Sequence, residues 1–389
     1  MKFNKWTMGL AAIGVVSLAS AARADEKMSQ VQTALSNTTL SGYVDTAVTW
    51  RPGTDANANG GPNLPLYSYA QNDGFSLNAV DIALDKPEDE TPWAAGYHVE
   101  MMFGQQNPVG IPGFANGLGS LRQAYLTLRT PVGGSGIDWK VGVFDTIIGY
   151  ESNSDPLNPN YTRSYGYTIE PTTHTGVLAT FKANDIVSFS AGIANTWSEG
   201  VILTPTGTTY ESQKTYMGAV ALTAPDSAGF MKGATLNAGI VNGTDSFANG
   251  AGSQTSYYVG ATIPTPVTAL KVGASFDYHA LHTRLGETWV GALYASFQAN
   301  DKLSFNARAE YLQDDTGALY GFNAPGVQRN AAEEFTATVQ YQLWANVLSR
   351  AEFRWDHVEH GNPFGVSSTT GAADRSNDFL LALNLIYQF

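Results

Sequence analysis

The chain alternates apolar and polar residues over many short segments. Its last eleven residues, Phe379 to Phe389, carry apolar or aromatic side chains at every odd position. A period of two places all of these side chains on one face of a β-strand. A last strand with one fully apolar face and a terminal aromatic residue is typical of an outer-membrane barrel, whose closing strand faces lipid.

Sixteen segments of about ten to thirteen residues show this alternation. They begin near Leu40, Phe75, Ala94, Ser120, Ile137, His174, Asp185, Lys214, Gly233, Thr255, Thr268, Glu287, Lys302, Glu333, Val347 and Asp378. A strand of this length rises about 35 to 40 Å, and at a tilt of about 45° it spans the roughly 25 Å apolar band of such barrels. The sequence therefore predicts an all-β fold, a transmembrane antiparallel β-barrel of about 16 strands formed by residues 39–389.

The connections between these segments alternate in length. The short ones include residues 182–185, 264–266, 299–301 and 344–346, and the long ones include 51–74, 105–119, 149–173, 314–332 and 358–377. Short periplasmic turns and long outer loops alternate in outer-membrane barrels, whereas a soluble β-sandwich has no reason to sort its loops in this way. This pattern places both termini on the periplasmic side.

Tryptophans lie at the ends of the predicted strands. We expect two aromatic girdles on the outward face, because amphipathic rings suit the headgroup layer of a membrane. Their predicted members are Trp50, Trp93, Trp139, Trp197, Trp289, Trp355 and Phe389. Parity with neighbouring apolar residues places Trp344 on the inward face instead. Aromatic residues that cap the two ends of a sandwich are the alternative.

The first 24 residues have the pattern of a signal peptide. Lys2 and Lys5 precede a short apolar core from Leu10 to Leu18, and Ala22 and Ala24 form a small-x-small cleavage site. We expect residues 1–24 to be removed and residues 25–38 to form a short periplasmic segment. No later stretch approaches the roughly 20 continuous apolar residues of a membrane-spanning helix.

Composition supports strands rather than a soluble core. Only 14% of the residues are charged while 43% are hydrophobic, and an ordinary soluble domain has about 25% charged residues. The lack of cysteine excludes disulfides, cysteine-ligated metals and thiol nucleophiles. Without the three basic residues of the signal, 18 basic residues face 34 acidic ones, a net charge of −16. This charge makes nucleic acid an unsuitable partner and favours a weak preference for cations in a channel.

Charged residues alternate on the inward face of two predicted strands. These pore-lining candidates are Arg308, Glu310, Arg350, Glu352, Arg354 and Asp356. An unpaired buried charge costs several kcal/mol, so this face is either in contact with water or fully paired. The first interpretation is the wall of a water-filled channel that selects solutes by charge. A structural network of ion pairs in a closed or plugged barrel is the alternative.

The connection from Gly149 to Thr173 is too long for a turn and too rich in aromatic residues for a disordered tip. Around it, the runs FDTIIGYE at 144–151, NPNYTRSY at 158–165 and EPTTHTG at 170–176 resemble the putative β-barrel porin type 2 family of Gram-negative bacteria. LRQAYLTL at 121–128 and the opening strand SGYVD at 41–45 also resemble it, and the similarity is strongest across residues 40–180. The resemblance implies a porin-like barrel in the outer membrane, in contact with lipid and lipopolysaccharide.

No functional residue is carried over from that family. Arg163, Glu170 and His174 are candidates on their chemistry alone, since they would narrow or select within a lumen if the loop folds inward. In the alternative interpretation, Arg163 and His174 only pin the loop to the wall, together with Asp145 and Tyr161.

An enzymatic function has little support in the sequence. No Gly-x-Ser-x-Gly motif occurs, and the histidines near positions 279 and 357 fall on opposite faces by parity. We therefore expect no catalytic residue, metal or cofactor. The favoured function is passive diffusion of small hydrophilic solutes or ions through a porin, with a closed adhesive or structural barrel and a secreted β-rich hydrolase or lectin as alternatives. A homotrimer is compatible with this strand number.

Resemblance to outer-membrane proteins in general implies that the C-terminal strand, with Phe389, is read by the barrel-assembly machinery. Deletion of Phe389 should lower the amount of assembled barrel in membranes more than it lowers the conductance of the barrels that form. Quantitative membrane blotting beside single-channel recording tests this, and near-normal membrane levels would count against the interpretation.

Overall fold

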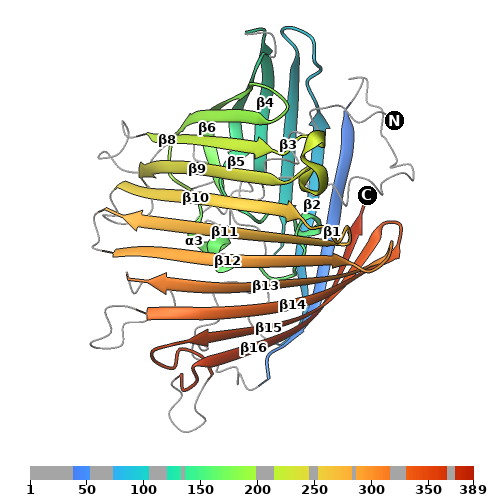
Figure 1. The fold of residues 1–389 in the computed structure, drawn as a ribbon, viewed down its shortest axis with the longest axis vertical. Helices are drawn as coiled ribbons and strands as arrows, with labels where there is room; N and C mark the ends of the chain where they lie inside the picture. Colours follow the sequence, from blue (N-terminus) through green and yellow to red (C-terminus); the bar gives the residue numbers. More distant parts are fainter. Residues whose placement is uncertain are drawn as a thin grey trace.

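Sixteen antiparallel strands form one closed barrel (Figure 1), in which β1 (Thr39–Trp50) pairs with both β2 (Gly74–Lys86) and β16 (Asn377–Gln388). The structure is a computed structural model. It describes residues 38–52, 73–104, 121–132, 136–198, 214–244, 253–282, 286–315, 330–365 and 373–389. The expected signal peptide, and all but the last residue of the segment 25–38, lie outside the described residues.

The predicted fold class and strand number are confirmed, and every strand starts within three residues of its predicted start. The strands are β1 (Thr39–Trp50), β2 (Gly74–Lys86), β3 (Ala95–Phe103), β4 (Leu121–Thr130), β5 (Ile137–Asp145), β6 (Thr173–Lys182), β7 (Val187–Ala194), β8 (Thr215–Thr223), β9 (Thr235–Thr244), β10 (Ser253–Pro264), β11 (Leu270–Leu281), β12 (Gly286–Gln298), β13 (Leu303–Asp314), β14 (Asn330–Trp344), β15 (Val347–Val358) and β16 (Asn377–Gln388).

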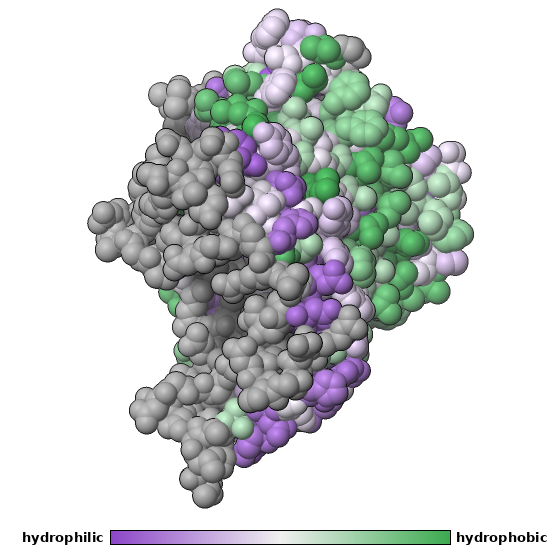
Figure 2. Space-filling model, turned by 90° about the vertical axis from the view of Figure 1, so that its left-hand side faces the viewer, coloured by the Kyte–Doolittle hydropathy of each residue, from purple (hydrophilic) through white to green (hydrophobic). Residues whose placement is uncertain are grey.

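The alternation sorts side chains between the outside and the inside of the barrel. In β16, Leu381, Leu383 and Leu385 are exposed, whereas Leu380 and Asn384 between them are buried. Figure 2 shows a broad field of hydrophobic residues with hydrophilic residues gathered at its border. An exposed apolar face of this extent fits a lipid environment.

The first and last strands close the barrel at their short-turn ends. The N–H of Gly42 donates to the carbonyl of Phe389 at 3.1 Å, and the N–H of Phe389 donates to the carbonyl of Gly42 at 3.0 Å. A side chain at position 42 would collide with the carbonyl of Asp81 in β2. Glycine at this position therefore lets three strands approach closely where the sheet closes.

The connections alternate as predicted, with three exceptions in length. The four predicted short turns all lie at one end of the barrel, between β6 and β7, β10 and β11, β12 and β13, and β14 and β15. At the opposite end, however, only residues 282–285 join β11 to β12. At the short-turn end, the connection from β8 to β9 contains a 3₁₀ helix, η3 (Asp226–Met231). The connection from β9 to β10, residues 245–252, is also no longer than the one from β2 to β3 at the short-turn end.

Two tryptophans lie on the opposite face from the one predicted. Trp197 is only 8% exposed, and its ring stacks on the inward-facing His279 with centroids 4.7 Å apart. It follows β7, which ends at Ala194, so the strand's parity does not extend to it. Trp344 is 69% exposed, because a β-bulge between Gln342 and Trp344 shifts it onto the outward face.

The remaining predicted girdle residues are at least partly exposed. Trp50 and Trp93 are exposed, and the others, Trp139, Trp289, Trp355 and Phe389, are half-buried. Among the described residues no helix is long and apolar enough to cross a membrane.

Replacing Leu383, which is 60% exposed at the middle of β16, by arginine should lower the free energy of unfolding by about 2–4 kcal/mol. The matched variant Phe75→Arg, at the rim end of β2, should lower it by about 0–1 kcal/mol, since the cost of a charge depends on depth. Denaturant titration of barrels folded in lipid vesicles measures both, and equal losses at the two positions would contradict a lipid-facing wall.

Candidate functional site: the inward loop

The connection from β5 to β6, residues 146–172, folds into the barrel. It contains a 3₁₀ helix, η2 (Asp155–Leu157), and a short α-helix, α3 (Tyr165–Ile169). The α3 helix contacts β11 and β12 and lies behind them in Figure 1. Ser164 caps it, with the side-chain oxygen accepting the N–H of Tyr167 at 3.0 Å. We call residues 146–172 the inward loop.

The first part of the inward loop packs by apolar contact. Ile148 joins a buried cluster with Phe144, Leu178 and Val241 on the barrel wall. The ring of Tyr150 stacks on Tyr294 of β12 with centroids 4.0 Å apart. The chain turns at Gly149 with φ of 114°, a conformation that favours glycine, and a side chain there would meet the Glu170 carboxylate.

Carboxylates of the wall accept hydrogen bonds from the backbone of the inward loop. Glu352 of β15 accepts the N–H groups of Tyr161 and Thr162 at 2.6 and 2.9 Å. Glu310 of β13 accepts the N–H of Tyr165 at 2.9 Å. A loop inside a barrel lacks strand partners, so each of these bonds satisfies a donor that would otherwise be buried unpaired.

Arginines of the same strands donate to the loop's carbonyl oxygens. Arg308 donates to Thr162 O at 2.8 Å, and Arg354 donates to Arg163 O at 2.7 Å. Arg350 donates to the carbonyl of Asp155 at 3.1 Å. The wall thus binds both the donors and the acceptors of the loop's main chain.

The same arginines form ion pairs. Arg308 Nη1 lies 2.8 Å from Glu151 of the loop, and Arg308 Nε lies 3.1 Å from Glu334 of β14. Arg354 lies 2.7 Å from Asp356. The pairing offsets the cost of removing these charges from water.

All six pore-lining candidates point inward, as parity predicts, and none is more than 5% exposed. They lie beneath the inward loop, in contact with protein rather than with solvent. Their role in lining a water-filled path stays a prediction.

The three loop candidates serve the loop's own conformation in this structure. The guanidinium of Arg163 pairs with Asp155 at 2.8 Å and is fully buried. Glu170 follows α3, and burial together with the neighbouring Asp277 carboxylate raises the pKa of Glu170 well above its usual range. His174 lies in β6, where its Nε2 is 3.1 Å from the Thr146 hydroxyl. The roles of these three residues toward a solute, and the alternative that Arg163 and His174 pin the loop to the wall, stay predictions.

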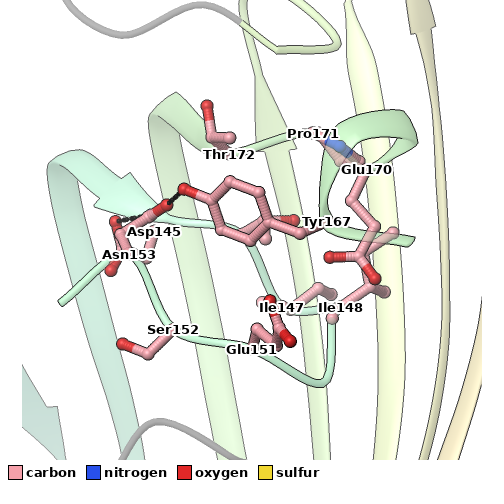
Figure 3. Close-up of a pocket in the computed structure, with 12 residues that line it drawn as sticks. Asp145, Ile147, Ile148, Glu151, Ser152, Asn153, Tyr167, Glu170, Pro171 and Thr172 are labelled. Atoms are coloured by element: carbon pink, nitrogen blue, oxygen red, sulfur yellow. Dashed lines mark hydrogen bonds between the residues drawn. The ribbon is translucent and has the colours of Figure 1, made fainter. Parts of the chain in front are cut away.

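The two ends of the inward loop enclose a small cavity (Figure 3). The Tyr167 hydroxyl donates to the side-chain oxygen of Asn153, whose amide in turn donates to Asp145 at 3.0 Å. The free volume inside is about 30 Å³, enough for one or two waters and too small for an organic ligand. The residues around this cavity therefore hold the loop in shape and do not form a site for an organic ligand.

The comparisons with known proteins agree with the barrel fold. A family model described as putative beta-barrel porin-2, OmpL-like, matches residues 37–389. The chain belongs to this porin family. A search of curated proteins found no match.

Solved outer-membrane barrels share the fold of this porin-family chain at low sequence identity. The outer membrane channel DcaP of Acinetobacter baumannii is 13% identical, with a TM-score of 0.58 over 90% of this chain and 97% of that one. An anion-selective porin from Comamonas acidovorans is 14% identical, with a TM-score of 0.57 over 90% and 99%. The trimer form of OmpT from Vibrio cholerae is 12% identical, with a TM-score of 0.57 over 90% and 99%. These likenesses show the fold alone.

Sequence reasoning missed several residues of this porin-family site. Glu334 lies on the inward face of β14, between the outward-facing Glu333 and Phe335, so parity could have found it. Glu151 and Arg122 carried no such signal. Glu151 lies in the loop, and Arg122, which contacts Glu100, lies at the register shift between β3 and β4. Among the described residues no group of three or more metal-type ligands was found.

Replacing Glu352 by alanine should loosen the inward loop, since two buried N–H groups lose a charged acceptor worth about 2 kcal/mol. Hydrogen exchange in detergent micelles should show the protection of the Tyr161 and Thr162 amides falling about 30-fold. The control Glu359→Ala removes an exposed carboxylate and should leave this protection unchanged. Equal protection in Glu352→Ala and the parent would contradict the anchoring role.

Proposed function

We propose that this porin-family barrel is an outer-membrane porin, with a water-filled channel for passive diffusion of small hydrophilic solutes or ions. The observation that carries the proposal is the inward loop, which is hydrogen-bonded to β13 and β15 inside a closed barrel whose outer face is apolar. A loop inside a barrel narrows a pore, and inward residues such as Thr180 and Ser190 stay partly exposed beside it. The activity is a non-enzymatic passage of solutes.

Within this proposal, the charged residues of β13 and β15 set the width of the channel by anchoring the loop. Burial of all six candidates supports this role over direct contact with solute. Arg163, Glu170 and His174 contribute by fixing the loop's path, and the selectivity then depends on the residues that the loop leaves uncovered.

A closed or plugged barrel with an adhesive or structural role is the second candidate. It is favoured by the same loop, because its residues 158–165 are largely buried against β13, β14 and β15. The third interpretation, a secreted soluble hydrolase or lectin, is disfavoured by the exposed apolar outer face.

The proposal includes the surroundings of the barrel. A signal peptide of residues 1–24 would export the chain, and both termini would then face the periplasm, with the long connections outside. Outer-membrane lipid and lipopolysaccharide would contact the apolar wall, and the barrel-assembly machinery would read β16. The trimer form of a structurally similar protein supports a homotrimer.

Purified protein reconstituted into planar lipid bilayers should give discrete conductance steps. A variant with residues 152–168 replaced by a short Gly-Ser linker should give larger steps, because the loop narrows the path. Steps only in the shortened variant would favour the plugged barrel. Absence of steps in both, with folding verified by heat-modifiable migration on a denaturing gel, would overturn the porin.

A further inference from the structure

Two buried carboxyl groups meet near the point where the inward loop returns to the barrel wall. Glu170 caps the C-terminal end of α3, which contacts β11, and Asp277 lies on the inward face of β11. Their side chains are within hydrogen-bonding reach of each other. Glu170 is 7% exposed and Asp277 is 2% exposed. We call these two residues the carboxyl pair.

The backbone of the inward loop closes around the carboxyl pair. A side chain at Gly149 would collide with the Glu170 carboxylate, and one at Gly166 would collide with that of Asp277. Figure 3 shows the Glu170 side chain pointing toward the turn that carries Ile148. The two carboxyl groups are therefore held between the main chain of the loop and β11.

No cation is paired with either member of the carboxyl pair. Among the described residues, neither Glu170 nor Asp277 forms an ion pair, and both carboxylate oxygens of Asp277 lack any other hydrogen-bond partner. Arg308 of β13 is engaged elsewhere, since it lies 2.8 Å from Glu151 and 3.2 Å from Glu310. These two acids act on Glu170 with the same sign as Asp277 does. The charges that act most strongly on Glu170 are therefore negative.

The other titratable groups around the carboxyl pair are tyrosines. Tyr258 of β10 interacts with both carboxyl groups and with Tyr150 of the loop. Tyr294 of β12 stacks on Tyr150. Tyrosine is uncharged at neutral pH, so these rings do not offset a negative charge.

Two ionised carboxylates are not stable in contact at a buried position, because both lose water and each repels the other. A carboxylate also has no hydrogen to donate, so a hydrogen bond between two such groups requires that one of them is protonated. The raised pKa of Glu170 agrees with this requirement.

We propose that Glu170 and Asp277 share one proton, and that this proton latches the inward loop to β11. While the proton is bound, α3 stays against the wall. When hydroxide takes it from Glu170 and forms water, two negative charges face each other and the end of the loop leaves β11. The latch goes beyond the proposed function, because it needs only the geometry of the loop, and its effect on conduction rests on that function.

Hydrogen exchange in detergent micelles tests the latch. Because the pKa of Glu170 is raised, the stability that the proton contributes is complete below the ordinary range of a glutamate and is lost as the pH rises through the raised value. Protection factors of the α3 amides, corrected for intrinsic exchange at each pH, should fall about tenfold for each pH unit above that value, since one proton is lost. Protection that stays constant up to about pH 10, where tyrosines begin to ionise, would overturn the latch.

Two variants separate the latch from other alkaline effects. Glu170→Gln keeps the shape of the side chain and donates an N–H to Asp277 at every pH, so its protection factors should not change with pH. The control Glu88→Gln removes a carboxyl group outside the inward loop, between β2 and β3, and should show the fall of the parent. If Glu170→Gln does not fold, Asp277→Asn makes the same comparison.

Two outcomes of these exchange measurements contradict the latch. One is a fall in Glu170→Gln as steep as in the parent. The other is a loss of protection at neutral pH when EDTA is added, because a divalent cation and not a proton would then join the two groups.

Conductance relates the latch to the proposed function. In planar bilayers the steps of the parent should grow as the pH is raised above the same value, toward those of the variant with residues 152–168 replaced, while the steps of Glu170→Gln stay constant. Constant steps in a parent whose protection falls would overturn the effect on conduction. A barrel whose protection falls but which never conducts would refute the porin and leave the latch intact. A conducting barrel with constant protection would refute the latch alone.

Discussion

Charged side chains of the wall bind the backbone of the inward loop, and the rest of the interior depends on this interaction. An irregular segment enclosed by a barrel has N–H and C=O groups that no strand can satisfy. Glu310 and Glu352 accept from the loop, while Arg308 and Arg354 donate to it. Because the same charges also pair with one another, the loop can lie against β13 to β15 without leaving an isolated ion in a buried place.

This arrangement makes the interior asymmetric. On β15 and β16 the inward residues from Leu348 to Val358 and from Asp378 to Ile386 are all buried. On β6 to β9, where Ile148 of the loop packs on Leu178 and Val241, some small inward residues stay partly exposed. The alternating arginines and carboxylates of β13 and β15, which the sequence favoured as the wall of a channel, lie beneath the loop in this molecule.

The fold was predictable because contact with lipid favours apolar residues at the outward positions of every strand. Alternation located all sixteen strands within three residues. It failed where the period itself breaks, at the bulge before Trp344 and beyond the end of β7 at Trp197. The site was less predictable, since Tyr161 and Glu352 are 191 residues apart. The sequence pointed to the loop and to the charged strands separately. It did not show that they touch, because the wall side chains bind backbone atoms of the loop, and such contacts do not depend on which side chains the loop carries.

Recognition through the main chain has a consequence for how such a barrel can evolve. The anchoring groups of β13 and β15 hold amides and carbonyls of residues 161–165, which every amino acid except proline supplies in full. Mutations in the loop can therefore change its surface while the anchorage persists. The segment inside the barrel can therefore change its side chains without a matching change in the wall that holds it.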